Sequence, residues 1–126
     1  MNKKLNILLV DDSEKITSLI KLTLLRYDTI KTIETTHTLL LAKEMLNKET
    51  IDAVILDMHL PDGNGISLLK WIKLNHSSTI VIMFSNHSDS FFRDAAAKAG
   101  AEYFLDKTTE FEQIPKIISE LHKQQL

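Results

Sequence analysis

The chain of 126 residues has no cysteine, few glycines and prolines, and no long hydrophobic run. Disulfide scaffolds and thiolate metal sites are excluded because both need cysteine. The apolar segment Leu5–Val10 is too short for the hydrophobic region of a signal peptide with its cleavage site, and no run approaches a membrane span. We therefore expect a cytoplasmic protein without a membrane partner.

The chain also lacks an excess of positive charge. Its formal net charge is −2, and no basic stripe stands out, so direct nucleic-acid binding by this domain is disfavoured. Hydrophobic residues make up 44% and charged residues 25%, which is typical of globular proteins. A chain of this length buries a core but is too short for two ordinary domains, so we expect residues 1–126 to form a single domain.

Short apolar runs alternate with segments of helical periodicity along the whole chain. The runs predict five strands, over Leu5–Val10, Thr29–Thr36, Asp52–Asp57, Thr79–Ser85 and Ala101–Lys107. A helix is expected after each strand, the fourth closed by Gly100 and the fifth with Pro115 in its first turn. Near-continuous apolar strands separated by helices indicate a parallel α/β sheet covered on both faces.

Polar side chains stand at the carboxyl ends of four predicted strands: Asp11-Asp12, Asp57, Ser85 and Lys107. In a parallel sheet these ends share one edge, and ligands bind there at the point where the strand order reverses. Each residue also has a local interpretation, in which Asp12 or Ser13 caps a helix, Asp62-Gly63 forms only a turn, Ser85 closes a strand and Lys107 is a solvated charge. Those interpretations do not explain the common edge, and a shared site does.

Three carboxylates at one edge repel one another unless a cation lies among them. Oxygen ligands without cysteine or paired histidines favour a hard ion, and Mg²⁺ is the natural choice. Lys107 would suit an anion carried by that metal. An aspartate that attacks phosphorus forms an aspartyl phosphate, so a phosphoryl group on Asp57 is a candidate for the chemistry.

Four segments in this order resemble the receiver domain of two-component response regulators: "LLVDDS", "VILDMHLPDGNG", "IMFSN" and "GAEYFLDK". The similarity covers about residues 4 to 121. It implies the flavodoxin-like, doubly wound fold, with five helices around a five-stranded parallel sheet of order 2-1-3-4-5.

The resemblance also implies a role for each matched residue. Asp57 would be the phosphoacceptor, with Lys107 and Ser85 bound to the phosphoryl oxygens. Mg²⁺ would be held by Asp11, Asp12, Asp57 and the backbone carbonyl of His59. Ser85 and Phe104 would form the switch that changes the surface of the fourth helix, fifth strand and fifth helix.

The implied function is signalling rather than turnover of a substrate. A histidine kinase or phosphotransfer protein would donate the phosphoryl group, and an output domain, a target protein or a second copy of the chain would read the changed surface. The chain would catalyse only its own phosphorylation and dephosphorylation. Two alternatives are a Mg²⁺-dependent phosphatase with an aspartate nucleophile and a binding module that keeps only the fold. The phosphatase type uses Asp-x-Asp, whereas Asp57-Met58-His59 stands here.

The sequence departs from the receiver-domain pattern at two positions, and two histidines lie close to site residues in the sequence. Thr108 stands where the family commonly has proline after the lysine, so a cis bond cannot be assumed. Asn86 stands where the family often has a small residue. His59 and His87 each lie two residues past a site residue. We hypothesise that they tune dephosphorylation through their charge, although both also fit ordinary loop positions.

Overall fold

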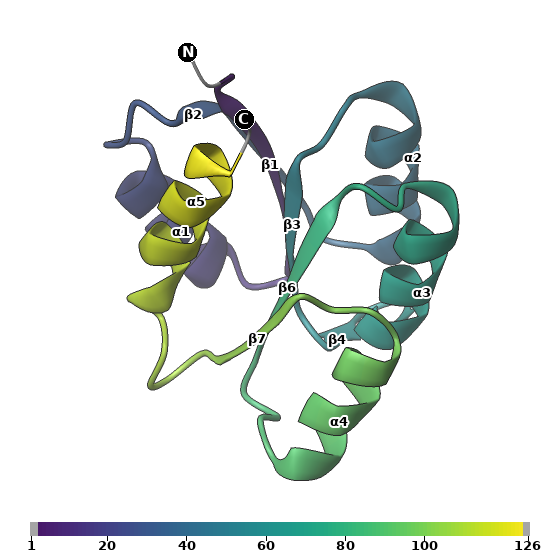
Figure 1. The fold of residues 1–126 in the computed structure, drawn as a ribbon. Helices are drawn as coiled ribbons and strands as arrows, with labels where there is room; N and C mark the ends of the chain where they lie inside the picture. The colour runs from purple at the N-terminus through teal and green to yellow at the C-terminus, as the bar shows by residue number, and fades with distance from the viewer. Residues whose placement is uncertain (1–2, 125–126) are drawn as a thin grey trace.

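Five apolar runs form one parallel sheet in the computed structural model, which describes residues 3–124 (Figure 1). The strands of the sheet are β1 (Leu5–Val10), β2 (Ile30–Thr36), β3 (Ala53–Leu56), β6 (Ile80–Ser85) and β7 (Tyr103–Asp106). The helices are α1 (Glu14–Leu24), α2 (Leu39–Lys48), α3 (Gly65–Asn75), α4 (Ser90–Lys98) and α5 (Gln113–Lys123). The order β2-β1-β3-β6-β7 confirms the predicted fold, since it reads 2-1-3-4-5 over the five strands.

The sheet separates two hydrophobic layers. α1 and α5 cover one face with side chains such as Ile20, Leu24 and Ile118, and α2, α3 and α4 cover the other (Figure 1). Alternation along β7 sends Tyr103 to the first layer and Phe104 to the second, as expected for a strand. The central strands β1 and β3 are almost wholly buried because helices lie on both of their faces.

The helices begin and end at residues whose chemistry suits those positions. Side chains of Ser13, Thr38, Asn64 and Asp89 accept hydrogen bonds from the first turns of α1, α2, α3 and α4. Gly100 follows the end of α4 with φ of 105°, the left-handed conformation that glycine adopts most readily, which confirms its predicted place.

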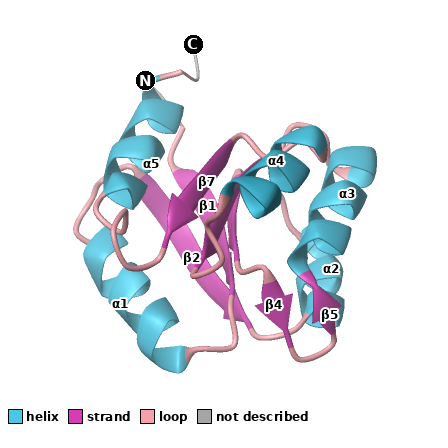
Figure 2. Ribbon diagram, turned by 90° about the horizontal axis from the view of Figure 1, so that it is seen from below, coloured by secondary structure: helices cyan, strands magenta, loops and turns pink. Residues whose placement is uncertain are grey.

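A small antiparallel hairpin, β4 (His59–Leu60) and β5 (Gly63–Asn64), follows β3 and was not predicted (Figure 2). In its turn, the Asp62 carboxylate accepts hydrogen bonds from the N–H groups of Leu39 and Leu40, at 2.8 Å and 3.1 Å. Asp62 therefore satisfies two free donors at the start of α2, beyond the simple turn considered from the sequence.

The helices differ in how firmly they are anchored to the sheet. α3 buries Gly65, Leu68, Leu69 and Ile72, whereas α4 buries only Ala96 among its residues. Phe91 of α4 is 72% exposed, and Phe92 is half-buried. Among the helices of residues 3–124, none is long and apolar enough to cross a membrane.

Candidate functional site

The ladder hydrogen bonds of the sheet continue one residue past three strands and so fix the backbone of the site. The N–H of Asp11 donates to Thr36 O at 3.1 Å, and that of Asp57 donates to Val10 O at 2.9 Å. The N–H of Lys107 donates to Ser85 O at 3.1 Å. The same pairing that builds the core therefore places these residues at one edge of the sheet.

Their side chains meet in a compact charged cluster. Lys107 Nζ lies 2.7 Å from Asp11 Oδ2 and 3.1 Å from Asp57 Oδ2. The other oxygens are held by backbone N–H groups, with Ser13 donating to Asp11 Oδ1 at 2.9 Å and Met58 donating to Asp57 Oδ1 at 2.8 Å. Asp57 is 9% exposed and Asp11 4%, whereas Asp12 is exposed. The pairing with Lys107 offsets the cost of burying these carboxylates.

The electrostatics of the cluster leave an excess of negative charge. Burial and the nearby charge of Asp11 raise the pKa of Asp57, and Lys107 and the Met58 N–H offset only part of that rise. Burial alone would lower the pKa of Lys107, but its bonds and charge contacts with Asp11 and Asp57 outweigh burial and raise it. A cation that joined the three carboxylates would relieve the remaining repulsion.

The carboxylates suit a divalent metal. One oxygen each from Asp11, Asp12 and Asp57 lies within 4.8 Å of the others, and the set contains oxygen only. Hard cations such as Mg²⁺ prefer this donor chemistry and retain several waters as further ligands. Asp12, which is exposed, is accessible to such an ion from the solvent side.

A pocket of about 340 Å³ opens over the cluster, and its lining consists of Asp11, Asp12, Ser13, Asp57, His59, Asn86, His87 and Lys107. The rings of His59 and His87 pack edge to face with centroids 4.4 Å apart. Phe92 extends this contact, at 5.6 Å from His87 and 6.5 Å from His59. His59 at the start of β4 and His87 after β6 therefore flank the acids as one packed group with the start of α4.

Two of the predicted residues, Ser85 and Phe104, do not line this pocket. Ser85 is fully buried, and its Oγ accepts a hydrogen bond from His87 N–H at 3.1 Å. Phe104 packs in the core layer under α4, with the Arg93 guanidinium 5.1 Å from its ring centroid. The peptide bond between Lys107 and Thr108 is trans.

Gly65 matters to the site in a way that sequence reasoning missed. A Cβ at this position would lie 2.1 Å from the carbonyl oxygen of Asp57. The Gly65 N–H also donates to Met58 O at 2.6 Å, so the chain after the hairpin returns against the residues that follow β3. The second glycine of "DGNG", Gly65, was the available signal in the sequence. Its close approach to the Asp57 backbone arises only in the folded loop.

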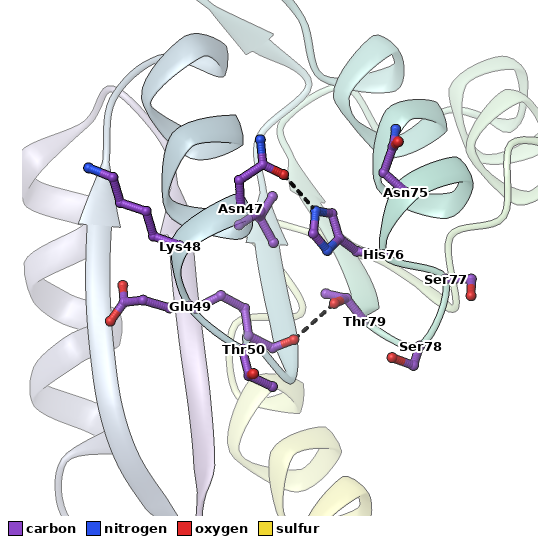
Figure 3. Close-up of a pocket in the computed structure, with 11 residues that line it drawn as sticks. Asn47, Lys48, Glu49, Thr50, Asn75, His76, Ser77, Ser78 and Thr79 are labelled. Atoms are coloured by element: carbon purple, nitrogen blue, oxygen red, sulfur yellow. Dashed lines mark hydrogen bonds between the residues drawn. The ribbon is translucent and has the colours of Figure 1, made fainter.

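A second hollow, of about 490 Å³, lies between the ends of α2 and α3, where His76 Nε2 and Asn47 Oδ1 are 3.1 Å apart (Figure 3). Its lining includes one carboxylate residue, Glu49, and otherwise amides, hydroxyls, His76, Lys48 and aliphatic groups. The larger volume does not make it the better candidate, because the charged cluster lies in the pocket at Asp57.

Comparisons with known proteins agree on one family. A family model described as "Response regulator receiver domain" matches residues 7–119. The chain is 32% identical over 114 residues to the response regulator protein PilR of Pseudomonas aeruginosa, covering 89% of this chain and 25% of that protein. It is 36% identical over 107 residues to the transcriptional regulatory protein CpxR of Escherichia coli, covering 85% and 43%. The chain therefore spans less than half the length of these two relatives.

Solved structures show the same fold. The receiver domain of a Francisella response regulator superposes with a TM-score of 0.86 at 25% identity, covering 96% of this chain and 98% of that one. The beryllofluoride-activated NtrC4 receiver domain dimer gives a TM-score of 0.84 at 28% identity, with coverage of 96% and 98%.

Proposed function

The chain belongs to the family of response regulator receiver domains, and we propose that it accepts a phosphoryl group on Asp57 within a two-component system. The observation that carries the proposal is the Asp57 carboxylate, which opens on a pocket between an ammonium group and two further acids. A histidine kinase or phosphotransfer protein would be the donor. The chemistry acts on the chain itself.

Each side chain has a defined task in this proposal. One Oδ atom of Asp57 would attack phosphorus and form an O–P bond, while the P–N bond to the donor breaks and the donor histidine leaves. Asp11, Asp12, Asp57 and the backbone carbonyl of His59 would hold Mg²⁺, which supplies charge neutralisation for the phosphoryl oxygens. Lys107 exchanges its contact with Asp57 for one with a phosphoryl oxygen.

The output would follow from movement of Ser85. Its hydroxyl is held by His87 N–H, and reaching a phosphoryl oxygen would break that hydrogen bond. The segment into α4 would then shift and change the packing of Phe104, so the surface of α4, β7 and α5 would differ between the two states. An output domain, a target protein or a second copy of the chain would bind that surface.

The proposal predicts one added phosphoryl group when the protein is incubated with acetyl phosphate and Mg²⁺, measured by intact mass. Asp57→Asn should abolish the addition, because the amide is not a comparable nucleophile. Removal of divalent metal with a chelator should reduce uptake by at least an order of magnitude. A phosphoryl group mapped to a serine or histidine would contradict the assignment, and rapid turnover of a phosphomonoester would favour the phosphatase alternative.

The packed histidines lead to a second prediction about the phosphorylated form. The rings of His59 and His87 flank the pocket, so removing one should open the acyl phosphate to water. We expect His87→Ala to shorten the acyl phosphate lifetime severalfold, with His59→Ala acting in the same direction. His76→Ala, in the hollow of Figure 3, is the matched control and should leave the lifetime unchanged. Equal lifetimes in all four proteins would remove the role of the pair.

A further inference from the structure

The two segments that follow Ser85 and Lys107 are joined by a polar network outside the charged cluster. The Ser88 hydroxyl, between β6 and α4, donates to the Asp106 carboxylate at the end of β7. The other oxygen of Asp106 accepts the N–H groups of Thr108 and Thr109, at 2.7 Å and 3.0 Å. Asp106 thus closes the turn that follows Lys107 and links that turn to the segment that follows Ser85.

Arg93, in the first turns of α4, spans the same two segments. Its Nε donates to Ser88 O at 2.7 Å, one terminal nitrogen donates to Phe104 O at 3.1 Å, and the other donates to Glu110 Oε1 at 2.9 Å. The guanidinium also lies 5.1 Å from the Phe104 ring centroid. A planar fork of donors meets acceptors in three directions, which the single nitrogen of lysine does not reproduce.

Glu110 completes the link to the backbone of the strand. Its Oε1 accepts the Asp106 N–H at 3.0 Å besides the bond from Arg93. The Asp106 N–H lowers the pKa of Glu110, with Arg93 acting in the same direction, and the Ser88 hydroxyl lowers the pKa of Asp106. Both carboxyl groups therefore favour the ionised form, whose oxygens accept these hydrogen bonds.

The network differs from an ordinary surface ion pair. The Arg93 and Glu110 side chains are more than one-third exposed, and an isolated pair of that kind contributes little. Here the guanidinium bonds two backbone carbonyls and one carboxylate, and that carboxylate in turn holds a strand end. The network therefore acts by fixing the positions of the two loops relative to each other.

We propose that Arg93 is a positioning residue that clasps the segment after Ser85 to the turn after Lys107, so that the hydroxyl and the ammonium reach the phosphoryl group in one arrangement. The inference rests on the proposed function, because it assumes that both groups serve the phosphoryl group on Asp57. The clasp consists of Arg93, Ser88, Asp106 and Glu110. It touches no atom of the acid cluster itself.

The test compares Arg93→Ala, Arg93→Lys and Glu110→Gln with the parent, and uses Lys98→Ala, an exposed lysine of the same helix, as control. The rate of phosphoryl uptake from acetyl phosphate is measured over a range of Mg²⁺ concentrations. Arg93→Ala should slow uptake about tenfold, since small misplacements of a positioned group cost one to two orders of magnitude. The apparent Mg²⁺ constant should not change, because the acids hold the metal.

The conservative variants separate geometry from charge. Arg93→Lys keeps the charge but loses the fork, so it should slow uptake nearly as much as Arg93→Ala. Glu110→Gln keeps an acceptor oxygen and should remain within about twofold of the parent. Uptake at the parental rate in Arg93→Ala, or full rescue by Arg93→Lys, would overturn the clasp.

Amide hydrogen exchange of the unphosphorylated protein gives a reading that is independent of the proposed function. The N–H of Asp106, whose acceptor Glu110 Oε1 is held by Arg93, should exchange at least tenfold faster in Arg93→Ala and Arg93→Lys than in the parent, with the strands β1 and β3 unchanged. Unchanged exchange at Asp106 would refute the clasp even if Asp57 is phosphorylated. Faster exchange in a protein that never takes up phosphoryl would instead refute the proposed function alone.

Discussion

Replacing Lys107 by methionine should lower the free energy of unfolding by about 2 kcal/mol at pH 7.5 without divalent metal. Methionine keeps the apolar stem but leaves the carboxylates of Asp11 and Asp57 facing each other without the ammonium that now lies between them. The effect is set below that of a fully buried pair, because the cluster opens on a water-accessible pocket. Urea unfolding checks the value, with Lys98→Met as the exposed control.

The pH dependence of this variant gives a second check. The raised pKa of Asp57 means that its ionisation destabilises the folded parent, so this penalty is absent at low pH and appears as pH rises through the folded pKa. Lys107 now lowers that pKa, and its loss raises the pKa further and enlarges the penalty. The difference between Lys107→Met and the parent should therefore shrink as pH falls from 7 toward about 4, and it should also shrink on addition of Mg²⁺. A difference that is constant with pH and metal would show that the ammonium does not screen these carboxylates.

Gly65→Ala should be the most disruptive single-methyl change at the site. The added Cβ would lie 2.1 Å from the Asp57 carbonyl oxygen, which is backbone and cannot rotate away. We expect a loss of about 3 kcal/mol in the free energy of unfolding, at the upper end for overpacking, because the start of α3 or the end of β3 must move. Phosphoryl uptake should fall more than the folded fraction does, since displacement of β3 moves the acceptor itself.

The matched control for this change is Lys70→Ala, on the exposed face of α3. It should leave both stability and uptake close to those of the parent. Gly65 does not have the positive φ seen at Gly63 and Gly100, so the expected cost is steric rather than conformational. Parental stability in Gly65→Ala would mean that the close approach of the two backbones is not required.

The parallel sheet could be predicted because five apolar runs and the β–α alternation both depend on local sequence, whereas its strand order followed from the resemblance to receiver domains. The same pattern brought Asp11, Asp12, Asp57 and Lys107 to one edge, where the structure also places them together. The roles assigned to these residues remain predictions. The hairpin β4–β5 was missed because two-residue strands carry no periodicity that a pattern can detect.

Other features of the site depend on contacts between segments distant in sequence. The need for Gly65 arises only when the loop after β3 folds back on Asp57. The bonds of Arg93 to Ser88, Phe104 and Glu110 depend on how α4 lies against β7, which periodicity does not fix. Alternation along a strand explains why Phe104 and Tyr103 lie on opposite faces of the sheet, but it does not predict the guanidinium over the Phe104 ring.

The sparse burial of α4, with Ala96 alone fully enclosed, has a thermodynamic consequence. A helix that sequesters so little hydrocarbon gives up little hydrophobic free energy when it detaches, so partial unfolding there should precede the global transition. α4 would then detach from an otherwise rigid protein, and the hydrogen bonds of Arg93 would set how often it detaches.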